Sequence, residues 1–383
     1  MSVSVRPGMD LLLDSPAELR NARVGLVCHP ASATSRGVHS SVALRKTIGG
    51  RLTCLLGPEH GVAGRGGAGE KLDHARHEKW GIPVYSLYGD TRRPTAAMLR
   101  RLDVIVFDLQ DLGARPYTYV STLRYVLEAA AEHGKRVIVA DRPVPLAHAV
   151  DGPVLDPRFE SFVGGIPSPV VYGMTPGETA LWLQRTLKLD VDLKIARAAG
   201  YRRQGRPRYR WIPSSPAIVS WDSGLCFPLT VFFEALPAVD HARGTRAPFQ
   251  AVGAPWLDTK AVCSKLRRGP ETGVSFTPCR YRAAIGAYRG QLVQGIRLHV
   301  KDPRCFLPVQ TSVLLLDAIR RVHGMEQLWN APGSRPAFFD KLMGADSARK
   351  GLLSGEQPER IFASWGPKTE AFLKSRDACL LYS

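Results

Sequence analysis

The chain has 383 residues, a length that predicts two domains rather than one. Hydrophobic residues make up 44% and charged residues 22%, as in an ordinary globular protein, and no apolar stretch is long enough to cross a bilayer. The formal net charge is +18, but the basic residues are scattered and never exceed two in a row, which argues against a nucleic-acid partner.

The first 200 residues alternate between strand and helix patterns. Short apolar runs rich in β-branched residues predict strands, and amphipathic stretches predict helices. The expected strands are 24–28, 52–56, 104–108, 136–140 and 191–195, with a brief extended piece at 83–87. The expected helices are 9–19, 39–48, 95–101, 121–133 and 175–187. This alternation indicates an α/β protein with a parallel sheet covered by helices on both faces.

The pattern changes near residue 200, where we place a domain boundary. A basic, loop-like stretch and then a Ser- and Pro-rich stretch follow it. Beyond them we expect a strand at 294–300, a helix at 309–322, and helical pieces at 338–343 and 358–374. The two predicted domains are therefore residues 1–200 and 201–383.

Polar side chains follow several predicted strands at their carboxyl ends, which in a parallel sheet share one edge. These residues are His29, Glu59, His60, Asp108, Gln110, Asp111, Asp141 and Arg142. Glu178 joins them at the start of its predicted helix. Acids, histidines and arginines gathered at one sheet edge favour acid–base chemistry on a polar ligand.

Each of these residues also has a structural explanation. Asp108 and Asp141 can cap helices or pair with Arg115 and Arg142, and Glu178 can complete a capping box with Thr175. The seven cysteines are widely spaced and lack a Cys-x-x-Cys pair, which argues against a disulfide framework and a structural zinc site. No short metal-ligand or nucleotide-binding motif occurs, so no metal or other cofactor is predicted. The N-terminus does not fit a secretory signal, and we expect a cytoplasmic protein.

Several motifs stand in a distinctive order along the chain. They are PEHG at 58–61, FDLQDLGARPYTY at 107–119, DRPVPL at 141–146 and YGMTPGE at 172–178. Together they resemble the exo-β-N-acetylmuramidases, the NamZ-like glycosidase family. The match runs nearly end to end, from GLVCHPAS at Gly25 through WIPSSP at Trp211 to RDACLLY at 376–382.

The resemblance implies a Rossmann-like N-terminal domain, a smaller α/β (α+β) C-terminal domain, and an active site in the cleft between them. It implies release of N-acetylmuramic acid from the non-reducing end of peptidoglycan fragments, so that the partner is a peptidoglycan-derived saccharide. The family's two motif glutamates fall on Glu59 and Glu178. Glycoside hydrolysis usually needs two carboxyl groups. We assign Glu59 as the acid, and Glu178 as the base or the group that orients the substrate's acetamido substituent; the sequence also allows the reverse assignment.

The lactyl carboxylate of muramic acid needs a cation, and Arg115 and Arg142 are the candidates, since an arginine can bind a carboxylate in two places. Tyr117 and Tyr119 are expected to stack on the sugar or to bond its hydroxyls. Tyr172 stands where the family usually has His, and we count it and the polar strand-end residues as substrate-binding. A further departure lies at 233–245, where FEALPAVDHARGT replaces the usual FEGTNLSEGRGT.

Three functions are therefore open. The first is a cytoplasmic glycosidase of cell-wall recycling, which the presence of both Glu59 and Glu178 favours. The second is a non-catalytic binder of anionic glycans, which the altered segment 233–245 favours. The third is a different hydrolase, with or without a metal ion, that uses the same cleft. The oligomeric state is not predicted.

Overall fold

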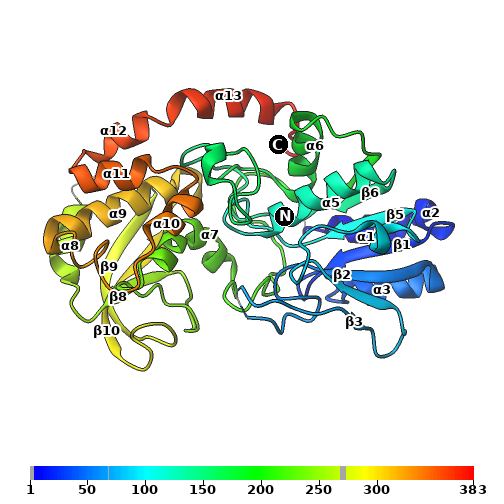
Figure 1. Ribbon diagram of the computed structural model, residues 1–383, viewed down its shortest axis with the longest axis horizontal. Coiled ribbons are helices and arrows are strands. Elements are labelled where there is room, and N and C mark those ends of the chain that lie inside the picture. Colours follow the sequence, from blue (N-terminus) through cyan, green and yellow to red (C-terminus); the bar gives the residue numbers. More distant parts are fainter. Residues whose placement is uncertain (1–3, 68, 268–272) are drawn as a thin grey trace.

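The computed structural model describes residues 4–67, 69–267 and 273–383. The chain folds into two packed units, one around a seven-stranded, mainly parallel sheet and the other around a three-stranded antiparallel sheet (Figure 1). The predicted α/β class, with a parallel N-terminal sheet and a smaller C-terminal unit, is confirmed. None of the described helices is long and apolar enough to cross a membrane.

The large sheet has the strand order β3-β4-β2-β1-β5-β6-β7. Among the described strands of this sheet only β3 runs antiparallel to its neighbour, and without β3 the order is that of a Rossmann fold. The strands are β1 (Val24–Cys28), β2 (Leu52–Gly57), β3 (Ala75–Arg76), β4 (Pro83–Ser86), β5 (Val104–Asp108), β6 (Arg136–Ala140) and β7 (Leu193–Ala196). The helices are α1 (Gly8–Asp14), α2 (Ala17–Arg20), α3 (Ser40–Ile48), α4 (Ala96–Leu99), α5 (Tyr119–Glu132) and α6 (Pro176–Thr186), with 3-10 turns η1 (Gly49–Arg51) and η2 (Pro157–Phe159).

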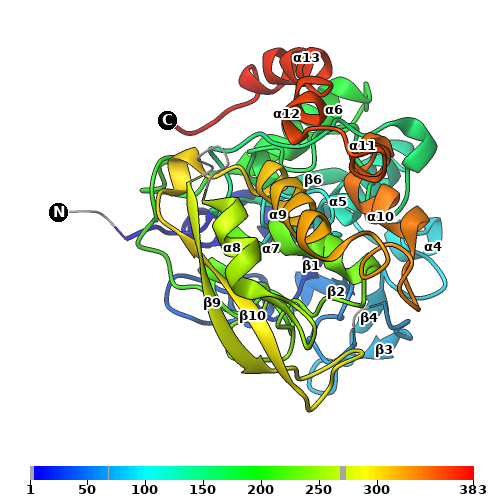
Figure 2. The ribbon, with the colours of Figure 1, turned by 90° about the vertical axis from the view of Figure 1, so that its left-hand side faces the viewer.

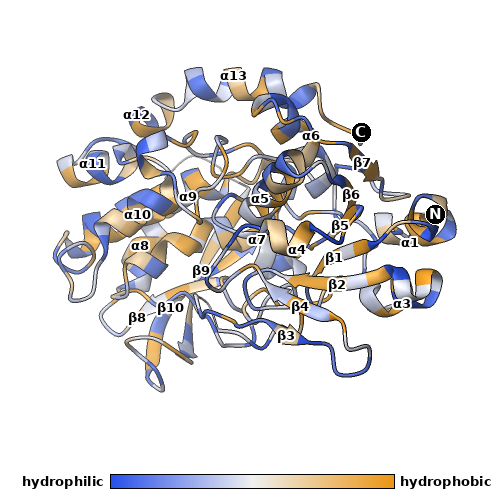
Figure 3. Ribbon diagram, turned by 45° about the vertical axis from the view of Figure 1, so that its right-hand side comes forward, coloured by the Kyte–Doolittle hydropathy of each residue, from blue (hydrophilic) through white to orange (hydrophobic). Residues whose placement is uncertain are grey.

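Side chains of the large sheet alternate between two apolar layers, because successive residues of a strand point to opposite faces. On β1, Leu26 and Cys28 pack in one layer with Met9 of α1 and Leu44 of α3. Val27 packs in the other layer, which includes residues of α5 and α6. Both faces are buried, and this explains why the strands appear in the sequence as nearly continuous apolar runs (Figure 3).

The second unit has the strand order β8-β10-β9, and all its pairs are antiparallel. Figure 2 looks onto this unit, in which β9 and β10 are the longest strands. Its strands are β8 (Ala251–Ala254), β9 (Val274–Arg282) and β10 (Leu292–Val300). Its helices are α7 (Trp221–Thr230), α8 (Thr259–Leu266), α9 (Pro308–His323), α10 (Pro336–Met343), α11 (Ser347–Ser354), α12 (Pro358–Ala363) and α13 (Gly366–Asp377), with 3-10 turns η3 (Val231–Ala235) and η4 (Pro303–Cys305).

Some element predictions were wrong in detail. The expected helix at 9–19 breaks at Pro16, which precedes α2, because a proline ring does not fit inside a continuing helix. The expected helix at 358–374 is divided into α12 and α13. The sequence interpretation also missed α7, α8, α11, β8 and β9. α7 carries Pro228 inside it, and β9 has polar residues and Pro278, so neither shows a clear apolar period.

The C-terminal segment returns to the large sheet (Figure 1). Helix α13 meets α6, where the indole Nε1 of Trp182 donates a hydrogen bond to the Ser375 hydroxyl at 3.0 Å. Beyond α13, the hydroxyl of Tyr382 donates to the buried Asp141 carboxylate at 2.7 Å and accepts from the Ala198 N–H at 2.9 Å. The last residues of the chain therefore close the carboxyl edge of the sheet at β6 and β7.

We expect Tyr382→Phe to lower the free energy of unfolding by about 2 kcal/mol, because it leaves the buried Asp141 without one donor. Urea denaturation followed by circular dichroism measures the change. Tyr125→Phe is the matched control, since Tyr125 is half-buried and its recorded contact is a ring stack with Phe162. Equal losses in the two variants would contradict a specific role for the Tyr382 hydroxyl.

Candidate active site

A cavity of about 340 Å³ lies between the two units, with walls from both. This volume is at the lower end of the range for small-ligand sites. The N-terminal part contributes Glu59, His60, Gly67, Pro116, Tyr117, Thr118, Tyr119 and Val163. Later segments contribute Ser215, Pro216, Ala217, Ile218, Phe227, Val231, Glu234, Arg243, Gly244, Phe249, Ile285 and Leu342.

Glu59 enters the cavity from the loop that follows β2. Its carboxylate accepts a hydrogen bond from the Gly69 N–H at 2.9 Å and another from the Thr118 hydroxyl at 2.7 Å. Both contacts suit an ionised carboxylate, which only accepts hydrogen bonds. The next residue, His60, has a left-handed backbone with φ of 69°, and its ring bonds the Gly66 carbonyl at 2.8 Å. These contacts hold the glycine-rich loop in place around Glu59.

A second glutamate, Glu234, faces the same cavity from η3 of the other unit. Its side chain is 26% exposed, and its Oε1 accepts a hydrogen bond from Nη1 of Arg243 at 3.0 Å. Burial raises the pKa of Glu234, and the charge of Glu59 raises it further, although the Arg243 guanidinium opposes both effects. The cavity therefore holds two carboxyl groups in different environments, one from each unit.

The sequence interpretation did not select Glu234 or Arg243. Both lie in the segment 233–245, which was noted only for its departures from the family pattern. A signal was present, because Glu234 is a single acid within the apolar run Val231-Phe232-Phe233 and Ala235-Leu236. A lone carboxylate among apolar residues is seldom buried without a partner or a function.

Tyr117 and Tyr119 line the cavity, and that they contact a sugar stays a prediction. Their hydroxyls are engaged away from it, since Tyr117 donates to the Ser214 hydroxyl and Tyr119 to the Ser214 carbonyl, each at 2.8 Å. Phe227 meets the Tyr117 ring edge-on at 5.6 Å between centroids. These three rings form an apolar wall of the cavity.

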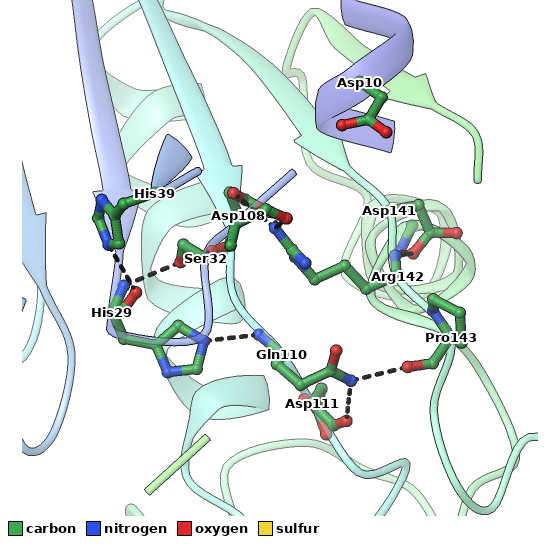
Figure 4. A network of polar contacts seen from close by, with 12 residues as sticks. Asp10, His29, Ser32, His39, Asp108, Gln110, Asp111, Asp141, Arg142 and Pro143 are labelled. Carbon is green, nitrogen blue, oxygen red and sulfur yellow. Dashed lines mark hydrogen bonds and ion pairs between the residues drawn. The ribbon is translucent and has the colours of Figure 1, made fainter. Parts of the chain in front are cut away.

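The polar residues at the ends of β1, β5 and β6 form a buried network instead of lining the cavity (Figure 4). The Nε and Nη2 of Arg142 grip the Asp108 carboxylate at 2.6 and 2.9 Å. The Gln110 N–H donates to Nε2 of His29 at 2.9 Å, and its side chain donates to the Pro143 carbonyl at 2.7 Å. His29, Asp108, Gln110 and Arg142 do not line the cavity, and their polar atoms bond one another or neighbouring groups. That they contact substrate stays a prediction.

Arg115, Asp111 and Tyr172 also bond to groups within the protein. The Arg115 guanidinium is fully buried and donates to the carbonyls of Ser168 at 2.7 Å and Met343 at 2.6 Å. Asp111 accepts from the Tyr172 hydroxyl at 3.1 Å. Neither Arg115 nor Arg142 lines the cavity, and that either holds a substrate carboxylate stays a prediction. The guanidinium groups of both arginines instead donate hydrogen bonds to buried oxygen atoms of the protein.

Glu178 does not line the cavity either. Its carboxylate accepts from the Thr175 N–H at 2.9 Å in a capping box, and it also contacts Arg203 and accepts from the Leu381 N–H at 2.7 Å. Asp141 lies beside it and accepts from the Thr175 hydroxyl at 2.7 Å. The capping box that was offered as a structural explanation for Glu178 is present. That Glu178 and Asp141 act on the substrate stays a prediction.

Position 177, which lies against Asp141 and directly precedes Glu178, requires a glycine. The N–H of Gly177 donates to Asp141 at 2.8 Å, and a Cβ at this position would lie 2.8 Å from the Asp141 carboxyl carbon. The motif YGMTPGE therefore contains the first turn of α6, which packs against Asp141 at the end of β6. Within the described residues, no group of three or more His, Cys, Asp or Glu side chains is placed to hold a metal ion.

Comparison with known proteins agrees with this architecture. The models of the N-terminal and C-terminal domains of exo-beta-N-acetylmuramidase NamZ match residues 24–222 and 225–382. The chain belongs to the NamZ family. It is 34% identical to the peptidoglycan beta-N-acetylmuramidase NamZ of Bacillus subtilis, over 99% of this chain and 91% of that protein.

Two solved structures of DUF1343 family proteins from Bacteroides fragilis are similar to this fold. One has a TM-score of 0.91 at 29% identity and covers all of both chains. The other has a TM-score of 0.79 at 27% identity and covers 100% of this chain and 99% of that chain. The two NamZ models meet between residues 222 and 225, in the first residues of α7.

Because Asp111 is buried, we expect the stability of the folded protein to depend on pH. Burial raises its pKa from 3.8 to about 6, so its contribution is fully present below pH 3.8 and is lost as the pH rises through 6. In Asp111→Asn the Oδ1 can still accept from the Gly113 N–H and the Tyr172 hydroxyl. We expect the stability of wild type relative to this variant to fall by roughly 2 kcal/mol between pH 4 and pH 7.

Urea denaturation of both proteins at pH 4, 5, 6 and 7 measures this difference. All other titrating groups are shared and cancel in the comparison. A difference that stays constant across the range would contradict a raised pKa at Asp111.

Proposed function

We propose that this NamZ-family protein is an exo-β-N-acetylmuramidase that releases N-acetylmuramic acid from the non-reducing end of peptidoglycan fragments. The observation that carries the proposal is the pair of glutamates, Glu59 and Glu234, that face one cavity from its two walls. Two carboxyl groups at one sugar-sized site are what glycoside hydrolysis usually requires. A pure binder of anionic glycans would have no need for two acids beside an anionic ligand.

The surroundings of the two glutamates suggest different roles. Glu234 has a raised pKa and is suited to hold a proton and donate it to the glycosidic oxygen as the C–O bond breaks. Glu59 accepts hydrogen bonds from Gly69 and Thr118 and is suited to act as the ionised partner. In the overall reaction the water oxygen bonds the anomeric carbon, and the proton it loses is taken up at this ionised carboxylate.

The small cavity supports removal of a terminal sugar rather than cleavage within a long glycan. Its volume of about 340 Å³ and its aromatic wall of Tyr117, Tyr119 and Phe227 fit one sugar ring with an apolar face. Whether the domain boundary is taken at residue 200 or at 222–225, Glu59 belongs to the first domain, and Glu234 and Arg243 to the second. Action in the cytoplasm on recycled wall fragments stays a prediction.

Substrate turnover tests the proposed function directly. Wild-type protein is assayed with the para-nitrophenyl glycosides of N-acetylmuramic acid and N-acetylglucosamine, and with the disaccharide N-acetylmuramyl-N-acetylglucosamine. We expect release of N-acetylmuramic acid from the disaccharide and a preference for the muramic glycoside. Absence of turnover with all three substrates would contradict the proposal.

The dependence on the leaving group tests the two roles. A sugar hydroxyl needs a proton to leave, whereas para-nitrophenolate needs little help. Glu234→Gln should therefore lower kcat/KM for the disaccharide by about 10²–10⁴-fold and affect the para-nitrophenyl glycoside much less. Glu59→Gln should slow both substrates to a similar extent.

Glu178→Gln provides the comparison with the motif-based assignment. We expect it to lower the melting temperature, because Leu381 and Arg203 lose an ionised partner. Below that temperature it should retain more activity than either cavity variant. The opposite order, with Glu178→Gln the most damaging to the disaccharide reaction of the folded protein, would return the acid–base role to Glu178.

A further inference from the structure

The proposed substrate differs from N-acetylglucosamine by a lactyl ether that carries a carboxylate. A site that prefers the muramic sugar needs a group that recognises this charge. Among the described residues that line the cavity, Arg243 is the one arginine, and no lysine is present. Arg115 and Arg142, by contrast, are buried outside it and bonded to the protein's own oxygens.

The Arg243 side chain keeps donors available. Its Nη1 donates to Glu234, its buried Nε has no hydrogen-bond partner, and its Nη2 makes no hydrogen bond with the described residues. The Nε and Nη2 of an arginine form the edge that binds a carboxylate through two parallel hydrogen bonds. Arg142 uses this same edge to grip Asp108 in this protein.

The neighbouring histidine does not compete for this role. Nε2 of His241 is buried without a hydrogen-bond partner and lies 4.0 Å from Oε1 of Glu234. Burial and the Arg243 charge lower the pKa of His241 to about 3, so the ring is neutral at physiological pH. Arg243 is therefore the fixed positive charge at this end of the cavity.

We propose that Arg243 is the specificity residue of the site, binding the substrate's lactyl carboxylate through its Nε–Nη2 edge while Nη1 stays on Glu234. This inference rests on the proposed function and names the group that selects its substrate. One consequence is a link between recognition and chemistry. A carboxylate on Arg243 shares the charge that otherwise neutralises Glu234, and so favours the protonated form that donates to the leaving oxygen.

The test compares substrates that differ only at the lactyl group. We measure kcat/KM for para-nitrophenyl glycosides of N-acetylmuramic acid, its lactyl amide and N-acetylglucosamine. In wild type the free carboxylate should be preferred over both alternatives. In Arg243→Gln the ratio of muramic acid to lactyl amide should fall by about 100-fold, and in Arg243→Lys by less, because a lysine keeps the charge but not the fork.

The ratio isolates recognition, since any disturbance of Glu234 affects all three substrates. Arg246→Gln is the matched control, because Arg246 is exposed on the same loop and does not line the cavity. It should keep the wild-type ratio. An unchanged ratio in Arg243→Gln, or an equal fall in Arg246→Gln, would overturn the proposal.

Binding separates this inference from the failure of the proposed function. Calorimetric titration of N-acetylmuramic acid into wild type, Glu59→Gln and Glu59→Gln/Arg243→Gln needs no turnover. We expect the double variant to bind about 100-fold more weakly than Glu59→Gln, while N-acetylglucosamine affinity changes little. Wild type that binds N-acetylmuramic acid through Arg243 without hydrolysing any glycoside would refute the proposed activity alone. Equal affinities in the two Glu59→Gln proteins would refute the role of Arg243.

Discussion

Charged side chains buried at the carboxyl edge of the large sheet need partners, and this need shapes much of the structure. Asp108, Asp141, Arg142 and Glu178 are almost completely excluded from solvent. Leaving any of them unpaired would cost several kcal/mol. The partners come from distant parts of the chain. Tyr209 donates to Gln110 and accepts from Arg142, and the terminal segment reaches Asp141 and Glu178 through Tyr382 and Leu381.

This pairing decides where a ligand can enter. In a sheet with this strand order, the usual crevice lies between the ends of β1 and β5, where the order reverses. In this protein the segment after residue 200 and the polar side chains of the buried network occupy that crevice. The cavity lies beside it, between the loop after β2 and the C-terminal unit. The buried network and the cavity are connected through Ser214, which accepts hydrogen bonds from the cavity-lining Tyr117 and Tyr119.

The cavity itself is built from contrasting environments. Glu59 sits on a glycine-rich loop with two donors fixed on its oxygens, whereas Glu234 lies in an apolar run next to Arg243. The same guanidinium can face a substrate anion and a protein carboxyl group. Acid–base roles and substrate selection can therefore depend on one set of three side chains, to which both units contribute. Closing the units together is what creates the proposed active site.

The sequence by itself determined the α/β class and most strands of the large sheet, because apolar periodicity is a local property. The order of its motifs indicated the NamZ family and pointed to Glu59 and Glu178. The sequence did not decide between Glu59 and Glu178, because each is a motif glutamate near the end or start of an element, and it did not select Glu234 or Arg243. Only the tertiary structure decided which charges are paired inside and which face the cavity. That outcome depends on hydrogen-bond partners that lie far away in the chain, such as Tyr382 for Asp141 and Leu381 for Glu178. A local sequence pattern does not identify such partners.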